Sequence, residues 1–249
     1  MPNYKKPPIK EAIIEIKFQQ NRLYTIESIK RLVQEYEKSS SLKISGENVR
    51  FHHISQNNSA HTDTQLVGYM LVNQSRSRVL HVDIDRLSYS FFGEYTGWKS
   101  LQKEFLSYWE QLTRLFNETI ENNQMFAQRL GVRFVNIIKL PIENFQESTK
   151  YIESNFVQDI AQYKKQHKTV REMTKRAVAY KDNYQYIIAE QICRNDQQKI
   201  DYFLDIDVAQ YSESGQSIID IPNILANLRD SKNDIFESYL KTKAKELFK

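Results

Sequence analysis

The chain has 249 residues, of which 40% are hydrophobic, and a formal net charge of +4. This length allows one large domain or two small ones with a sizeable core, and the mild charge permits nucleic-acid contact without requiring it. The single cysteine, Cys193, excludes an internal disulfide and a cysteine-based zinc site, and the six glycines form no phosphate-binding loop. Because no run approaches 18 apolar residues and residues 1–10 lack the apolar stretch of a secretory signal, we expect a cytoplasmic protein that does not bind membranes.

The first half of the chain predicts two helices and a set of strands. Apolar residues alternate over 9–18, which is typical of a strand that follows Pro7 and Pro8. Thr25 is suited to cap a helix over 25–39, in which apolar residues recur at helical spacing. Extended segments follow at 48–56, 65–73 and 78–92, and a long amphipathic helix begins near Thr96.

The second half predicts the same order of elements. Residues 129–140 alternate as a strand that Pro141 ends, and apolar spacing predicts a helix over 143–156. Further strands are expected at 176–180, 184–194 and 199–211. A final helix is expected over 220–248, with Asp220 as its cap and Pro222 in its first turn.

Three matched segments indicate that the two halves are repeats. In each match the two segments lie 122 positions apart in the chain. The matches are Ile16-Lys17-Phe18 with Ile138-Lys139-Leu140, Val82-Asp83-Ile84-Asp85 with Leu204-Asp205-Ile206-Asp207, and Tyr89-Ser90 with Tyr211-Ser212. We therefore expect an α+β fold built from a duplicated β-α-β-β-β-α repeat, at 1–122 and 123–249. Antiparallel sheets backed by helices would form one compact unit with an approximate two-fold axis, similar to the TATA-binding protein or to tandem ferredoxin-like units.

Acidic residues recur on the polar faces of two predicted strands. Alternate residues of a strand share a face, so His81, Asp83 and Asp85 point one way. Asp205 and Asp207 share the polar face of the corresponding strand in the second half. One hypothesis is a divalent-metal site formed by these residues, and the alternative is a solvated face on which the aspartates pair with Lys or Arg.

Clustered cations form a second candidate surface, because contacts to phosphate require them. The segment 164–176 holds six Lys or Arg residues and one Glu, and the preceding half adds two arginines in a hairpin. The alternative is a solvated loop between elements. The candidate nucleic-acid-binding residues are Arg76, Arg78, Lys164, Lys165, Lys168, Arg171, Lys175 and Arg176.

The densest aromatic segment is 91–98, with the sequence Phe-Phe-Gly-Glu-Tyr-Thr-Gly-Trp. Its two glycines permit an irregular backbone just before the long helix. Tyr and Trp are enriched among the residues that dominate protein interfaces, so Phe92, Tyr95 and Trp98 are candidate partner-binding residues. The alternative is core packing at a strand-to-helix corner.

The sequence assigns no catalytic residues. The histidines form no H-E-x-x-H or H-x-E pattern, and Cys193 lies in an apolar strand pattern typical of a small core residue. We therefore expect no cofactor, and binding rather than catalysis.

Several segments together resemble a sporadically distributed bacterial protein family of unknown function. The opening Pro7-Pro8-Ile9-Lys10-Glu11-Ala12-Ile13-Ile14-Glu15-Ile16-Lys17-Phe18 is similar to its P-P-I-x-E-A-x-x-E-I-x-F start, and Tyr95-x-Gly97-Trp98 to its Y-x-G-W segment. Residues 130–136 resemble its L-G-x-R-Y-x-N segment, with Phe134 in place of Tyr, and 233–240 its closing helix. The resemblance implies a patchily inherited accessory protein of the kind found among mobile and defence genes, and it supplies no site residues.

Two functions remain open at this point. The first is a non-catalytic binding or regulatory protein that recognises a partner protein encoded nearby, or a second copy of itself. The alternative is a nucleic-acid-binding protein, including a metal-dependent nuclease that would use the paired aspartates.

Overall fold

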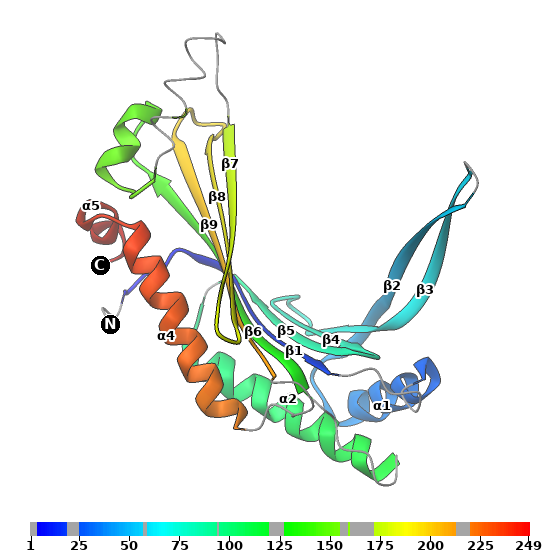
Figure 1. Cartoon of the computed structure of the whole chain (residues 1–249). Helices are drawn as coiled ribbons and strands as arrows, with labels where there is room; N and C mark the ends of the chain where they lie inside the picture. The colour runs from blue at the N-terminus through cyan, green and yellow to red at the C-terminus, as the bar shows by residue number, and fades with distance from the viewer. Residues whose placement is uncertain are drawn as a thin grey trace.

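The computed structural model describes residues 4–18, 25–56, 59–93, 95–119, 127–154, 159, 172–212 and 220–249. As the sequence predicts, the fold is α+β. Nine strands form one antiparallel sheet in the order β2-β3-β4-β5-β1-β6-β9-β8-β7. Figure 1 shows α1, α2 and α4 on one side of this strongly curved sheet, and the β2–β3 hairpin extending past them at one end.

The chain enters the sheet at its centre in both halves. The first half forms β1 (Ile9–Phe18), α1 (Ile26–Ser39), β2 (Lys43–Gln56), β3 (Ser59–Val72), β4 (Arg78–Asp83), β5 (Arg86–Phe92) and α2 (Trp98–Thr119). The second half forms β6 (Ala127–Leu140), the 3-10 helix η1 (Phe145–Lys150), β7 (Glu172–Lys181), β8 (Tyr184–Arg194), β9 (Ile200–Tyr211), α4 (Ile221–Tyr239), α5 (Thr242–Lys245) and the 3-10 helix η2 (Glu246–Phe248). Since β1 pairs with β6, each half lies on its own side of this central pair.

Three predicted elements are wrong in their type or continuity, and several strands begin earlier than predicted. The segment 78–92 is two strands, because a turn at 84–85 brings Asp83 opposite Arg86. In the described part of the predicted helix 143–156, the helical residues are those of the 3-10 helix η1, and Ile152 pairs as an extended residue with Leu240. The same pairing ends α4 at Tyr239, so the predicted final helix is interrupted before α5.

The helix ends follow the predicted caps in one case and not in the other. The Thr25 hydroxyl accepts a hydrogen bond from the Ser28 amide at 3.2 Å, as expected for an N-cap. Asp220 instead has a left-handed backbone, with φ of 51°, and makes no side-chain cap bond to α4. Its carboxylate accepts a hydrogen bond from Asn223 Nδ2 at 2.6 Å.

The core lies between the sheet and the helices. In β1, the even-numbered residues from Ala12 to Phe18 face the helices, and none is more than 5% exposed. Large side chains of the neighbouring strands and helices complete this layer, among them Tyr36, Tyr89, Phe105, Phe134 and Tyr202. Each buried side chain of this size contributes about 1.5–3 kcal/mol, so the apolar periodicity determines which face is covered.

The opposite face of the sheet carries the odd-numbered residues of β1, including Glu11, Glu15 and Lys17. None of the helices in the described part of the chain covers this face (Figure 1). Within those same residues, no helix is both long and apolar enough to cross a membrane. The fold therefore has two candidate binding surfaces, which are this helix-free face and the edge of the helical layer.

Candidate binding cleft

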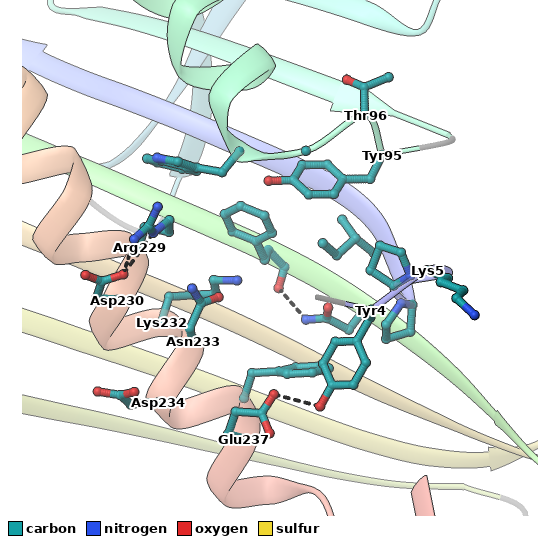
Figure 2. A pocket seen from close by; sticks show the side chains of 18 residues that line it. Tyr4, Lys5, Tyr95, Thr96, Arg229, Asp230, Lys232, Asn233, Asp234 and Glu237 are labelled. Carbon is teal, nitrogen blue, oxygen red and sulfur yellow. Dashed lines mark hydrogen bonds and ion pairs between the residues drawn. The ribbon is translucent and has the colours of Figure 1, made fainter. Parts of the chain in front are cut away.

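A cleft of about 850 Å³ opens at the edge of the helical layer. It is lined by the segment before β1, the corner between β5 and α2, the middle of β6 and one side of α4 (Figure 2). This volume lies in the range of small-ligand pockets, and a groove of this size also accommodates a short stretch of polypeptide.

The N-terminal wall of the cleft is fixed by its contacts. Pro7 and Pro8 keep the chain extended, and the Pro8 carbonyl accepts a hydrogen bond from the Ile137 amide at 2.8 Å, which extends the β1–β6 pairing. The Tyr4 hydroxyl donates to Glu237 Oε1 at 2.8 Å, and its ring packs edge-on against Phe236. The segment is therefore held against α4 before β1 begins.

The corner between β5 and α2 forms the aromatic wall. Gly93 and Gly97 have φ of 96° and 107°, a backbone conformation that favours glycine and that turns the chain sharply from strand to helix. The Tyr95 ring packs edge-on against Phe134 at 5.8 Å between centroids, and Trp98 lies 6.4 Å from the same ring. Two of the predicted partner-binding residues, Tyr95 and Trp98, thus meet in this wall.

Phe92 lies elsewhere. It pairs with Glu11 and shares the side of β5 opposite to the buried Tyr89 and Phe91, so it points to the helix-free face of the sheet. It is 37% exposed there. The three predicted partner-binding residues therefore belong to two different surfaces.

Lys232 lies at the floor of the cleft. It is 7% exposed, and its Nζ lies 4.0 Å from the centroid of the Phe134 ring. In Figure 2 no hydrogen bond or ion pair to Nζ joins it to the other residues lining the cleft. The neighbouring Asn136 is buried, and its Nδ2 donates to the Leu204 carbonyl at 2.9 Å.

Burial lowers the pKa of Lys232 to about 7, because the charged amine loses its hydration. The nearby Arg229 guanidinium lowers it further, and the Glu237 carboxylate partly opposes this effect. Burial also raises the pKa of Tyr95 above its ordinary value, so its hydroxyl stays protonated. At neutral pH, Lys232 is thus divided between its neutral and charged forms.

Three charged groups at the rim have charged partners, namely Arg229, Asp230 and Glu237. Arg229 Nε donates to Asp230 Oδ1 at 2.9 Å, and Lys245 forms an ion pair with Glu237 at 2.8 Å. Asp234 is exposed to solvent. The described lining residues hold three cations and three carboxylates, so the cleft as a whole carries no excess charge when Lys232 is protonated.

The aspartates predicted for a metal site lie on the helix-free face. Asp83 is fully buried, where Asn48 Nδ2 donates to it at 2.6 Å and Arg86 Nε at 3.0 Å. Asp85 forms an ion pair with Arg50 at 2.8 Å. The carboxylates of this half are therefore bound by side-chain cations and amides.

His81 and the second pair of aspartates show similar contacts. His81 Nδ1 lies 3.1 Å from Asn48 Oδ1, and burial lowers its pKa. Arg133 Nε donates a hydrogen bond to Asp205 Oδ1 at 2.9 Å, and Arg129 Nη2 donates one to Asp207 Oδ1 at 3.0 Å. Across the residues that the structure describes, no three His, Cys, Asp or Glu side chains are grouped so as to hold a metal ion.

The basic candidates are dispersed. Arg78 pairs with Glu104 at 2.9 Å and stacks over Phe91, and Lys175 pairs with Asp159. Arg76 and Arg176 are exposed. The other four candidates lie outside the described residues: Lys164, Lys165, Lys168 and Arg171.

Lys232, Asn136, Tyr4 and Arg229 are site residues that the sequence reasoning did not identify. A signal for Lys232 exists, because the buried residues of α4 recur at positions 221, 225, 228, 232 and 236. A lysine within such an apolar stripe marks a charge directed inward.

The cleft also gathers the segments on which the family resemblance was based. Pro7 and Pro8, Tyr95 with Trp98, and Phe134 with Asn136 all line it, together with the start of 233–240. A scan against protein-family models and a search of curated proteins found no match to this chain. The case for a binding role of the cleft therefore rests on the arrangement of its lining residues.

Proposed function

We propose that this is a cytoplasmic, non-catalytic binding protein of a bacterial accessory gene module, of the mobile-element or defence kind, and that its cleft binds a segment of a partner protein. The observation that carries this proposal is that Tyr95, Trp98 and Phe134 meet Lys232 in one cleft of about 850 Å³. Among the described residues that line the cleft, Lys232 has no ion-pair partner. Aromatic side chains in concave, partly desolvated positions provide much of the binding energy of protein interfaces.

The rigidity of the walls supports recognition of a preformed shape. The N-terminal segment is held by the Tyr4 hydroxyl and the Pro8 carbonyl, and the corner is held by aromatic packing on Phe134. A binding site whose walls are already ordered loses less conformational entropy when its ligand binds.

The charge of the cleft favours a polypeptide over a nucleic acid. A nucleic-acid site needs an excess of cations near the phosphates, whereas the described lining residues here balance. The nucleic-acid alternative is supported by the exposed Arg76 and Arg176. It requires that binding of a single-stranded oligonucleotide falls steeply with salt and weakens further in the Arg76→Ala and Arg176→Ala variants.

The protein-binding proposal is tested by affinity purification from the native host. The wild type should retain a stoichiometric partner that Trp98→Ala loses by at least tenfold. The matched control is Tyr180→Ala, since Tyr180 is an aromatic residue 70% exposed on the edge strand β7, away from the cleft. Equal retention by all three proteins, with Trp98→Ala still folded in thermal melting, would rule out the cleft as the binding site.

We also propose that residues 1–122 and 123–249 are repeats related by a pseudo-two-fold axis through the β1–β6 pair. Ala12 and Phe134, which are 122 positions apart, pair directly at this centre, as such an axis requires. Asp83 and Asp205 share that spacing but lie on β4 and β9, which hold different places in the sheet order. The separation of 122 positions therefore supports duplication of the central strands β1 and β6. It does not place the acidic segments of the two halves at equivalent positions in the sheet.

A further inference from the structure

Lys232 is placed where an apolar side chain would be expected. It occupies the buried stripe of α4 between Leu228 and Phe236, and only 7% of its surface is exposed. Removing an ammonium from water is costly unless a counter-charge or hydrogen bonds replace its hydration. The Phe134 ring, 4.0 Å away, supplies part of this through a cation–π contact, and the amine still lines an open cleft.

We propose that Lys232 forms an ion pair with a carboxylate of the bound partner segment, provided either by an acidic side chain or by a chain terminus. The inference rests on the proposed function, since it assigns the chemistry of the ligand that the cleft takes. The partner's carboxylate would supply the counter-charge that Lys232 lacks among the lining residues.

The surrounding charges favour a group with a single negative charge. On α4, Lys232 is flanked by the paired Arg229 and Asp230 on one side and by Asp234 and Glu237 on the other. From the N-terminal segment, Lys5 and the neutral Tyr4 face the cleft, from the corner the neutral Tyr95, and from β6 only the uncharged Phe134 and Asn136. A phosphate with two charges would meet three carboxylates, whereas a carboxylate replaces a single missing counter-charge.

The aromatic wall defines what accompanies the carboxylate. Phe134 lies under the ammonium and also contacts Tyr95 and Trp98, so a carboxylate bound to Lys232 lies beside these rings. The ligand residue next to the carboxylate is therefore apolar or aromatic, because it packs against Trp98 and Tyr95.

Binding of this kind is linked to proton uptake. A carboxylate pairs with the charged amine, so the ligand raises the pKa of Lys232 above its value of about 7 in the free protein. When the protonated form alone binds, affinity falls by about 50-fold between pH 7 and pH 9. The same ligand without its carboxylate shows no such dependence on Lys232.

The test uses protein carrying ¹³C at the lysine ε-carbons, with the Lys232 signal assigned by its loss in Lys232→Met. Three short acetylated peptides, each containing a Trp, serve as probes. One carries a Glu and an amidated end, one has a free terminal carboxylate and no acidic side chain, and one has a Gln and an amidated end. A fourth arm uses inorganic phosphate.

We expect one of the two carboxylate peptides to raise the pKa of the Lys232 amine and to bind at least tenfold more tightly than the Gln peptide at pH 7. Whichever of the two acts identifies the source of the carboxylate. Lys232→Met should remove this preference and Lys232→Arg should preserve it without the loss at high pH. No change at Lys232 with either carboxylate peptide at millimolar concentration, or a larger change with phosphate, overturns the proposal.

The failure of this inference can be told apart from failure of the proposed function. If Trp98→Ala loses the natural partner while Lys232→Met binds it with unchanged affinity and pH dependence, the cleft stands and the carboxylate assignment fails. If neither variant affects the partner, both fail.

Discussion

The most direct consequence of the structure concerns the stability of the folded chain when Lys232 is replaced by methionine. Methionine fills a similar volume and carries no charge, so it suits the apolar stripe formed by Leu225, Leu228 and Phe236. The substitution removes the cost of burying an amine and leaves the packing of α4 on the sheet in place. We therefore expect Lys232→Met to be more stable than the wild type at neutral pH.

The size of the effect follows from the pKa. Each pKa unit corresponds to about 1.4 kcal/mol, so lowering the pKa of Lys232 from 10.5 to about 7 corresponds to a full cost of about 5 kcal/mol. Between these two values the unfolded chain binds more protons than the folded one, so the stability of the wild type rises with pH. The cost is about 4 kcal/mol at pH 7 and about 2 kcal/mol at pH 9.

The measurement is urea unfolding of wild type and Lys232→Met at pH 7, 8 and 9. The advantage of the variant should be largest at pH 7 and should shrink by about 2 kcal/mol by pH 9. Lys103→Met, at an exposed position of α2, is the matched control and should differ from the wild type by less than about 0.5 kcal/mol throughout. If the stability advantage of Lys232→Met stays constant or grows with pH, folding does not lower the pKa of Lys232 and the reasoning is wrong.

Two further predictions concern the close packing of two strands at Gly68 and the polar contacts of Glu104 on α2. Gly68→Ala should destabilise the protein by about 3 kcal/mol or more in urea unfolding, because a Cβ there would lie 2.3 Å from Asp83 Oδ1 and from a main-chain oxygen. Gly46→Ala, whose Cβ would meet only the end of a methionine at 3.5 Å, should cost under about 1 kcal/mol, and equal effects would contradict the crowding. Glu104→Gln should lower the free energy of unfolding by about 1–2 kcal/mol, since Glu104 accepts hydrogen bonds from Tyr89 and from Arg78 at 2.9 Å. An unchanged urea midpoint for Glu104→Gln would contradict a stabilising role for this cluster.

The elements that the sequence predicts correctly are those whose apolar pattern records a local contact. Residues 9–18 alternate because one side of β1 packs under the helices, and 25–39 repeats at helical spacing because α1 buries one stripe. The prediction of a helix over 143–156 is wrong because of a contact with a residue that is distant in the sequence. Ile152 pairs with Leu240, a residue from the other end of the second half, and this tertiary contact outweighs helical spacing.

The candidate site was predicted in part for the same reason. Tyr95 and Trp98 stand out because they cluster with glycines at a corner, which is visible along the chain. The cleft itself depends on Tyr4, Phe134 and Lys232, which come from three distant segments and meet only after the sheet has formed. The lysine within the apolar stripe of α4 was a further trace of the cleft in the sequence.

The two faces of the sheet show how a charge that stabilises the fold differs from one available to a ligand. On the helix-free face, Glu15 lies between Arg86 and Arg129, which in turn contact Asp83 and Asp207, so a row of alternating charges crosses the centre of the sheet. Each of these groups already has a counter-charge from a neighbouring strand, and such pairs mainly specify which strands lie side by side.

Room for this row is built into the strands, since a Cβ at Gly131 would lie 2.7 Å from the Arg129 guanidinium. Lys232 is the opposite case, because its helix, its neighbours on β6 and the wall around it supply an aromatic face but no paired carboxylate. Folding alone gives no reason to retain a buried amine at this position, since an apolar residue would pack there at lower cost. A ligand that supplies the missing charge gives such a reason, and the cleft above Lys232 is open to receive it.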